Sequence, residues 1–293
     1  MQEIEFKFQV PVKKRKALQK AFTLLKAEPI HLAAQYFDTA DQTLAKHCIA
    51  IRRRQENDEW KQTFKAVNSA KALSRFELEF DIAPPETTTL DLDNYKKDYS
   101  AIYKKLKRAL GLPLPTLELL FETKIQRLRV LQDVGSSTVE IALDIGKIFK
   151  EQSSVDIFEI EFELKQGSIE DLIAFIQPWI QKYQLSLDTH SKSDYGLQAV
   201  RQQSSFSAQY QTPLVLNRSS SEVEALQSIL ANCLQHLLPN ASSIARQQYS
   251  SEHVHQARVA IRRLRTALKS FAAWSDAIQP HWQMELTTIF QAL

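Results

Sequence analysis

The feature that most constrains the fold of this chain is a set of short segments in which charged and apolar residues alternate. In residues 2–10, Glu3, Glu5 and Lys7 fall on one face of an extended segment, and the apolar residues between them fall on the other. The same alternation recurs in residues 50–55, 59–67, 74–82, 124–131, 138–145 and 157–165. Pro, Gly or Asn-Asp turn signals separate several of these segments, which predicts an antiparallel sheet.

Each predicted strand carries a row of charges on one face. The further rows are Arg52 with Arg54; Lys61 with Lys65; Arg75, Glu77, Glu79 and Asp81; Arg127 with Arg129; Glu140 with Asp144; and Glu159, Glu161 and Glu163. One solvated face is ordinary, but so many charged rows indicate that the strands share one surface. If the sheet closes on itself, that surface is the interior of a barrel, and helices must cover the apolar outer faces. We therefore expect an α+β fold built on a closed antiparallel β-barrel with flanking helices.

The acidic rows have a chemical consequence inside such a barrel. Two carboxylates about 6 Å apart repel each other by roughly 3 kcal/mol at an effective dielectric constant near 20. Oxygen ligands without His or Cys suit a hard divalent cation, so the pattern predicts Mg²⁺ or Mn²⁺ as cofactor. The Arg and Lys rows predict a polyanion as ligand, because guanidinium and ammonium groups bind phosphate oxygens.

The chain divides near residue 200. Helical patterns interrupt the strands at about residues 12–26, 94–110 and 169–184, and after residue 201 the strand pattern stops. A Ser/Gln-rich stretch follows, and the remainder is helical in pattern. We expect a first domain at 1–200, a linker at 201–218 and a helical domain at 219–293.

Composition limits the location, the cysteine chemistry and the binding partners that we expect for the protein. No apolar run approaches the roughly twenty residues that span a bilayer, and the N-terminus lacks a signal-peptide pattern, which predicts a cytoplasmic protein without a membrane partner. Cys48 and Cys233 lie far apart, which argues against a disulfide framework or a zinc site. Basic and acidic residues balance in 1–200, so the net charge of +3 comes from the tail. We expect no nucleic-acid partner, and no pattern predicts an oligomeric state.

Residues 253–271 of the tail form a helical pattern with a basic face. The spacing of His255, Arg258, Arg262 and Arg265 places these side chains along one side of a helix. The opposite side is an apolar stripe of Ala257, Ile261, Leu264, Leu268 and Phe271. The basic face is either a solvated surface or a site for a polyanion.

The ordered set of motifs resembles the CYTH domains, also called triphosphate tunnel metalloenzymes, over about residues 1–200. The motifs are EIEFK, YFDT, IRRR, TFK, RFELE, VEIALD, FEIEFEL and SKSDYG. The resemblance implies an eight-stranded tunnel that hydrolyses a triphosphate with a divalent metal. It implies metal ligands at Glu3, Glu5, Asp144, Glu159 and Glu161, with Glu163 as a further candidate. It implies phosphate ligands at Lys7, Arg52, Arg54, Lys65, Arg75, Arg127 and Lys192. Glu161, Glu163 and Lys7 are the candidate catalytic residues.

The family includes inorganic, thiamine and RNA triphosphatases and class IV adenylate cyclases, so several substrates remain open. Tyr36, Trp60 and Phe64 are candidates to stack on an organic group, although single aromatic residues in strands are more often part of a core. We expect inorganic triphosphate as substrate, cleaved to pyrophosphate and phosphate. The alternatives are an organic triphosphate, or binding of polyphosphate or a nucleotide without turnover.

The tail motif HQARVAIRRLR resembles the CHAD domains, which are helical modules. That resemblance implies binding of long-chain polyphosphate through His255, Arg258, Arg262 and Arg265. The chain stops at LTTIFQAL without a helix stop signal, which predicts a truncated CHAD module.

Overall fold

The computed structural model describes residues 4–67, 75–87, 89–90, 92, 95–96 and 99–293. The chain forms two compact units. Among the described residues, the first unit holds residues 4–67, those from 75 to 186, and 191–203. The second unit holds residues 187–190 and 204–293. The predicted domain limits at 200 and 219 remain a prediction.

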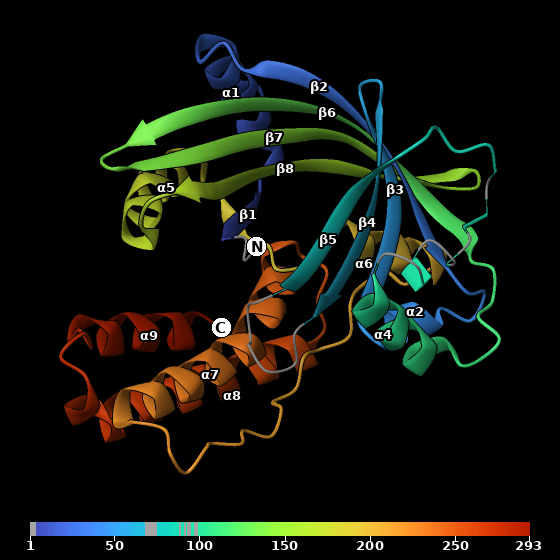
Figure 1. Cartoon of the computed structure of the whole chain (residues 1–293). Coiled ribbons are helices and arrows are strands. Elements are labelled where there is room, and N and C mark those ends of the chain that lie inside the picture. Colours follow the sequence, from blue (N-terminus) through green and yellow to red (C-terminus); the bar gives the residue numbers. More distant parts are fainter. Residues whose placement is uncertain (1–3, 68–74, 88, 91, 93–94, 97–98) are drawn as a thin grey trace. The chain divides into compact units, whose positions relative to one another are not determined.

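The first unit is built on one nine-stranded sheet with the order β5-β4-β3-β2-β6-β7-β8-β1-β9 (Figure 1). The strands are β1 (Glu5–Gln9), β2 (Glu28–Asp38), β3 (Ile49–Glu56), β4 (Glu59–Val67), β5 (Arg75–Ile82), β6 (Glu118–Val134), β7 (Ser137–Lys150), β8 (Ser153–Gln166) and β9 (Ser186–Leu187). Every pair from β5 through β1 is antiparallel. The predicted α+β fold, an antiparallel tunnel-type sheet with flanking helices and a helical C-terminal region, is confirmed.

The sheet differs in detail from the expected barrel of eight strands. Its order ends at β5 and at the two-residue β9, and among the described residues no ladder joins these two ends. Sequence analysis did not detect β2, because its inner positions, among them Ile30, Leu32, Ala34 and Tyr36, are apolar or aromatic instead of charged. The strands curve strongly, so the inner faces of β3–β5 and β6–β8 belong to one curved surface (Figure 1).

The strand register places the charged rows on this shared inner face. Lys7 on β1 lies opposite Glu161 on β8, and Glu159 lies opposite Asp144 on β7. Asp144 in turn lies opposite Arg127 on β6. Because side chains alternate along each strand, the neighbouring apolar residues all point to the outer face.

Helices cover the outer face, as the apolar pattern requires. The helices α1 (Val12–Leu24) and α5 (Ile169–Tyr183) are joined through Phe22 and Trp179, whose ring centroids lie 6.4 Å apart. Trp179 also packs against Phe162 of β8, with centroids 5.7 Å apart.

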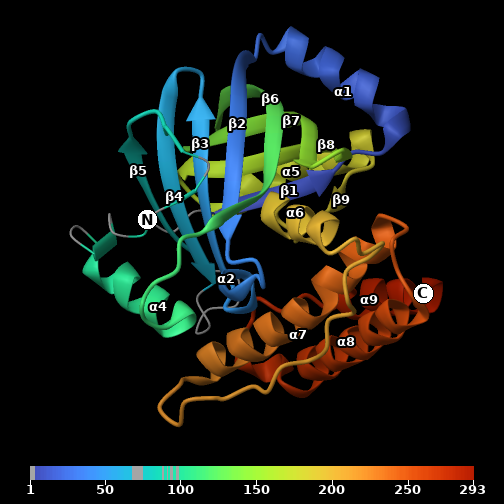
Figure 2. The ribbon, with the colours of Figure 1, turned by 90° about the vertical axis from the view of Figure 1, so that its right-hand side faces the viewer.

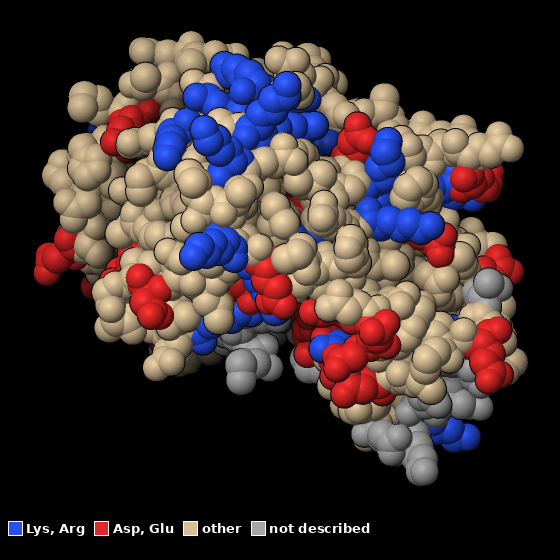
Figure 3. Space-filling view, turned by 90° about the horizontal axis from the view of Figure 1, so that it is seen from above, with Lys and Arg blue, Asp and Glu red and all other residues tan. Residues whose placement is uncertain are grey.

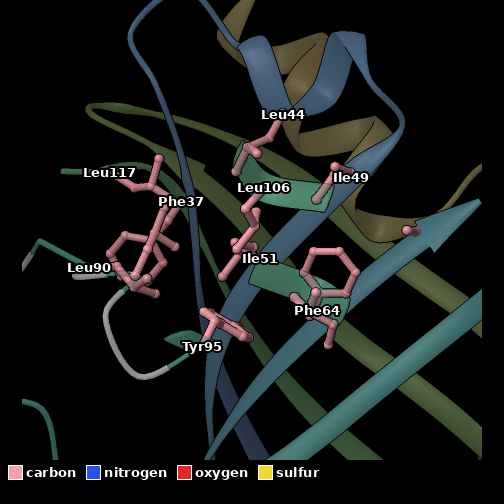
Figure 4. Close-up of a cluster of buried hydrophobic side chains, with 12 residues drawn as sticks. Phe37, Leu44, Ile49, Ile51, Phe64, Leu90, Tyr95, Leu106 and Leu117 are labelled. Atoms are coloured by element: carbon pink, nitrogen blue, oxygen red, sulfur yellow. The ribbon is translucent and has the colours of Figure 1, made fainter. Parts of the chain in front are cut away.

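A second core lies under α2 (Thr43–Lys46) and α4 (Ser100–Leu110), where Ile51, Phe64 and Tyr95 are fully buried (Figure 4). Apolar residues of β3 and β4 and of these two helices meet in this cluster. The outer face of the sheet is therefore packed at both ends.

The solvent side of α1 is basic. Lys13, Lys16 and Lys20 are exposed, and the helix holds no acidic residue. Lys and Arg side chains gather on the upper face of the molecule, the side on which α1 lies (Figure 3). These charges lie outside the sheet and are separate from the inner-face rows.

The second unit is helical (Figure 2). It contains α7 (Glu222–Ala245), α8 (Ser251–Ser270), a short 3₁₀ turn (Ala272–Trp274) and α9 (His281–Ala292). The apolar stripe of α8 is buried as far as Leu268, with Ala257 and Ile261 fully inaccessible, whereas Phe271 follows the helix and is half-buried. In the part of the chain that the structure describes, no helix has the length and apolar character to cross a membrane.

Two asparagines of α7 form hydrogen bonds with the backbone of the segment that precedes the helix. Asn240 accepts from the backbone N–H of Gln209 at 3.0 Å and donates to its carbonyl at 2.9 Å. Two turns earlier, Asn232 donates to the carbonyl of Thr212 at 3.1 Å. Part of the segment predicted as linker is therefore hydrogen-bonded to α7.

Candidate metal and anion site

Three buried carboxylates meet on the inner face of the sheet. Asp144 of β7 and Glu159 and Glu161 of β8 each offer an oxygen atom, and these atoms lie within 4.8 Å of one another. Asp144 is fully buried, and Glu159 is 2% exposed. Three negative charges in so small a space require cations nearby.

Basic side chains surround this carboxylate cluster, defined as Asp144, Glu159 and Glu161. Arg127 donates two hydrogen bonds to Asp144, from Nε to Oδ1 and from Nη2 to Oδ2, both 2.7 Å long. It also forms an ion pair with Glu161. Lys192 Nζ lies 2.8 Å from Asp144 Oδ2 and 2.7 Å from Glu161 Oε1, and it contacts Glu159 as well.

Lys7 completes the group from β1, with its Nζ atom 3.5 Å from Glu159 Oε2. Its ammonium also lies 5.6 Å from the centroid of the Tyr195 ring. Three cations from β1, β6 and a helix thus converge on three carboxylates from β7 and β8.

Lys192 reaches the cluster from α6 (Lys192–Val200), a helix that sequence analysis did not identify. Ser191 caps this helix: its hydroxyl accepts from the Asp194 N–H at 3.2 Å, and Asp194 accepts from the Ser191 N–H at 2.7 Å. A Cβ atom at Gly196 would lie 2.1 Å from the buried Phe121 ring of β6. The missing side chain therefore lets α6 approach the sheet closely enough for Lys192 to contact all three carboxylates.

A second charged group lies on β3, β4 and β5. Lys65 Nζ is 2.6 Å from Glu77 Oε2, and Arg54 Nη2 is 3.2 Å from Glu79 Oε2. Arg52 lies between the two carboxylates, 3.8 Å from Glu77 and 3.9 Å from Glu79. These cations are held in place by carboxylates of β5, which is the next strand for Lys65 and the second strand away for Arg52 and Arg54. Their positive charge is therefore already oriented toward the inner face.

The pKa values of two acidic residues, Glu161 and Glu5, are shifted in opposite directions. Burial acts to raise the pKa of Glu161, but the charges of Lys192 and Arg127 outweigh it and hold that pKa below its ordinary value. The charge of Glu161 in turn raises the pKa of Glu5 to about 7. Because the Glu5 side chain is exposed, we attribute this shift to the neighbouring charge more than to burial.

The carboxylates also shift the pKa values of the basic residues beside them. Burial acts to lower the pKa of Arg127 and of Lys192, but the carboxylates beside them raise both values well above the ordinary ones. Lys65 and Lys7 act to lower the pKa of Glu5, against the effect of Glu161. Lysines of β1 and β4 therefore act electrostatically on Glu5, a carboxylate outside the cluster.

Not every predicted site residue joins the carboxylate cluster. Glu163 pairs with Lys165 at 2.7 Å, and Glu140 lies 3.4 Å from the same ammonium. Glu3 lies outside the described residues, as does the side chain of Arg75. The roles predicted for Glu3, Glu163 and Arg75 stay predictions.

Two residues of the inner face were missed as site candidates. Lys165 continues the alternation of Glu159, Glu161 and Glu163, so the signal was present in the sequence. Thr63 accepts from Arg52 Nε at 3.3 Å and donates to Glu79 at 2.9 Å. Thr63 is a neutral residue between Lys61 and Lys65, so it did not stand out in the charged row of this strand.

In the helical unit, the predicted basic face of α8 lies partly against α9. The guanidinium of Arg258 lies 4.2 Å from the centroid of Phe290 and donates to the Phe290 carbonyl at 3.3 Å. Arg262 is exposed and lies 5.9 Å from the same ring, whereas Arg265 is half-buried and His255 is exposed.

Arg263, which the sequence did not single out, is the centre of a polar network instead. It donates to Asn232 at 2.6 Å and faces His236 Nδ1 at 3.3 Å. His236 Nε2 lies 2.8 Å from Gln256 Oε1. The bond from Arg263 requires an acceptor at Nδ1, so His236 is neutral with its proton on Nε2.

The donor set of the carboxylate cluster fits a hard divalent cation. All candidate ligand atoms are carboxylate oxygens, and no thiol or imidazole belongs to the group. Asp144, Glu159 and Glu161 are the residues that would hold Mg²⁺ or Mn²⁺. The identity of the metal is not distinguished by these ligands.

Comparison with known proteins agrees with this arrangement. The model of the CYTH domain matches residues 1–194, and the model of the CHAD domain matches residues 228–293. An inorganic triphosphatase from Haemophilus influenzae is 31% identical over 202 residues, which are 67% of this chain and 54% of that protein. The chain thus spans about half the length of this curated relative.

Solved structures of lower identity also match about two thirds of the chain. A putative adenylate cyclase from Bacillus halodurans is 20% identical with a TM-score of 0.46, covering 66% of this chain and 96% of that one. A putative adenylyl cyclase from Hippeastrum is 17% identical with a TM-score of 0.47, covering 67% and 96%. Since the CYTH model matches well over half of the residues, the chain belongs to the CYTH family.

Proposed function

We propose that this protein hydrolyses inorganic triphosphate to pyrophosphate and phosphate on the inner face of its sheet, with a divalent metal. The observation that carries the proposal is the convergence of Asp144, Glu159 and Glu161 with Arg127 and Lys192. Carboxylates that suit a hard cation thus stand beside cations that suit phosphate oxygens. The 31% identity to an inorganic triphosphatase supports the same activity.

In this proposal the basic residues of the inner face bind the substrate and stabilise the leaving group. Arg52, Arg54 and Lys65 bind phosphate oxygens from one side of the inner face, and Arg127 and Lys192 bind them from the other. Lys7, beside Glu159, stabilises the negative charge that grows on the leaving pyrophosphate. In the reaction, water attacks the terminal phosphorus, the P–O bond to the leaving pyrophosphate breaks, and the proton of the water passes to solvent or to a carboxylate.

The position of Glu161 in the carboxylate cluster, together with its lowered pKa, supports a role as a metal ligand. A carboxylate that stays ionised binds a cation well, but it is a weak general base near neutral pH. A metal held by Asp144, Glu159 and Glu161 would supply positive charge that offsets the charge of the phosphate oxygens. Glu163, paired with Lys165, remains a candidate base.

The aromatic residues of the sheet favour an inorganic substrate over an organic triphosphate. Phe64 is fully buried in the core with Tyr95, on the outer side of the sheet. Tyr36 is 6% exposed and stacks on Phe121, with ring centroids 4.5 Å apart. Tyr36 and Phe64 are therefore already engaged with protein side chains. The half-buried Trp60 lies on the same outer face of β4 as Phe64, away from the charged inner face.

The experiment measures release of phosphate and pyrophosphate from tripolyphosphate, ATP, thiamine triphosphate and long-chain polyphosphate. Each substrate is tested with Mg²⁺, with Mn²⁺ and with excess chelator. We expect tripolyphosphate to be cleaved fastest, with one phosphate and one pyrophosphate formed per turnover, and no turnover in chelator. Full activity in chelator would contradict the metal requirement, and binding of polyphosphate without phosphate release would favour the binding-module alternative.

A further inference from the structure

Residues 187–190, which precede α6, belong to the helical unit, although Leu187 is also the last residue of β9. Leu187–His190 belong to the second unit, whereas Ser191 and Lys192 belong to the first. Lys192, the cation that contacts all three carboxylates of the cluster, therefore follows this segment by only two residues.

Ser242 of α7 holds the backbone of the segment on both sides. Its hydroxyl donates to the Leu187 carbonyl at 3.0 Å and accepts from the Thr189 N–H at 3.2 Å. It also lies 3.4 Å from the Thr189 hydroxyl. The Ser242 side chain is 2% exposed, so water does not readily replace it as the partner of these groups.

The remaining residues of the segment are fixed as well. Asp188 has a fully buried carboxylate that lies 3.8 Å from Arg246 Nη1 and accepts from the His190 N–H at 2.9 Å. The His190 ring stacks on Phe206, with centroids 3.9 Å apart and an interplanar angle of 2°. The segment therefore has little freedom as long as α7 is intact.

The covalent path from this segment to the site is short. Residues two positions apart are joined by about 7 Å of extended chain, which leaves little slack to absorb a shift. Lys192 is the first helical residue of α6, and its cap Ser191 directly follows His190. A displacement of residues 187–190 must therefore move the start of α6 or strain its cap.

We propose that Ser242 and Arg246 of α7 are positioning residues for Lys192, so that the helical unit sets the affinity of the sheet for its triphosphate. The affinity effect rests on the function proposed above, whereas the anchoring of residues 187–190 does not. Ser242 and Arg246 act through Lys192 and are not themselves placed among the substrate ligands.

The test compares two adjacent serines of α7 in the full chain. Ser242→Ala removes the anchor, whereas Ser243→Ala removes a hydroxyl that is equally buried and has no hydrogen-bond partner among the described residues. Tripolyphosphate binding by titration calorimetry and steady-state kinetics are measured for both variants. We expect Ser242→Ala to raise Kd and KM about fivefold with a smaller change in kcat, and Ser243→Ala to leave all three unchanged.

A double-mutant cycle tests whether the effect passes through Lys192. We expect Ser242→Ala to weaken tripolyphosphate binding in the wild-type background and to add nothing in a Lys192→Met background. Arg246→Gln should behave like Ser242→Ala, and Arg246→Lys should restore part of the affinity because it keeps the charge beside Asp188. A general loss of folding would lower the Tm of both serine variants and would persist in the Lys192→Met background.

Two outcomes would overturn the proposal. One is equal Kd values for wild type, Ser242→Ala and Ser243→Ala, and the other is an effect of Ser242→Ala that is fully additive with Lys192→Met. Failure of the proposed function gives a different result, because the wild-type protein would then neither bind nor cleave tripolyphosphate. In that case, amide hydrogen exchange at residues 187–193 still decides whether Ser242 anchors the segment.

Discussion

The two sets of arginines in this protein, on the inner face of the sheet and on α8, were both expected to bind phosphate, but their surroundings differ. Arg52, Arg54 and Arg127 each lie within 4 Å of a carboxylate on another strand of the sheet. Arg258 and Arg262 lie instead beside the Phe290 ring. In residues 204–293, all of which are described, neither of these two forms an ion pair.

The difference indicates two ways of binding a polyanion. Paired guanidinium groups are already oriented, and a triphosphate with its metal must exchange with their carboxylates, which makes binding specific in geometry. Arginines without acidic partners keep their net charge, so they attract a long polyanion with little geometric discrimination. We therefore expect chemistry at the sheet and salt-sensitive retention at the tail.

The largest expected effect is at the carboxylate cluster. Glu161→Gln keeps the shape of the side chain but removes the charge that faces Arg127 and Lys192. We expect kcat on tripolyphosphate to fall by about a hundredfold or more, or about 2.7 kcal/mol of barrier. Phosphate release in the presence of saturating Mg²⁺ or Mn²⁺ is the measurement.

Glu163→Gln is the matched control, since Glu163 lies two residues further along the same face of β8 and pairs with Lys165. We expect a loss of less than about tenfold, because this carboxylate is outside the cluster. An equal loss in both variants would show that Glu163 takes part in the chemistry, as the sequence predicted.

The next effect concerns the tail. Replacing Arg258, Arg262 and Arg265 together with Gln should leave tripolyphosphate turnover unchanged, because a short substrate bound at the sheet does not need them. The same variant should bind long-chain polyphosphate about tenfold more weakly at low salt, with a log–log salt slope reduced by roughly 2 to 3. Binding isotherms at several salt concentrations provide both quantities.

A triple substitution of Lys13, Lys16 and Lys20 with Gln controls for simple loss of charge. These lysines are exposed on α1. Their substitution removes three positive charges from the sheet unit, as many as the arginine variant removes from the tail. If this variant loses long-chain polyphosphate binding as strongly as the arginine variant, the tail has no special role and the comparison between the two regions fails.

The smallest effect is a difference in pH dependence. Burial lowers the pKa values of His236 and His253 below 6.5, the ordinary value. A lowered pKa in the folded state means that the unfolded state binds more protons, so the stability gained from these histidines is complete above about pH 6.5 and is lost as pH falls. The raised pKa of Glu5 has the opposite sign, since it favours the folded state at lower pH.

Amide hydrogen exchange, corrected for intrinsic rates, separates the two regions between pH 7.5 and 5.5. We expect protection of α7 and α8 amides to fall by a few-fold on acidification, whereas amides of β1 and β8 keep or gain protection in metal-free protein. Glu5→Gln should remove the pH dependence contributed by Glu5 in the sheet. A parallel loss of protection in both regions would contradict the assigned signs.

The sequence predicted most of the sheet because burial and charge alternate with period two along β1, β3–β8. It missed β2, where Ala34 and Tyr36 give no charged row, and it missed α6, a nine-residue helix too short for a clear periodic signal. It also marked Arg258 and Arg262 on α8 but not Arg263, because spacing along one helix does not show which face packs against α7.

By itself the sequence determined which residues carry charge on each strand, and therefore that carboxylates and cations share a surface. Only the tertiary structure decided which of them meet. Glu161 and Glu163 are equivalent in the alternation, yet strand register brings Glu161 to Arg127 and Lys192 and leaves Glu163 to Lys165. Local pattern fixes the face of a side chain, whereas its partners depend on long-range pairing between strands and on the close approach of α6 at Gly196.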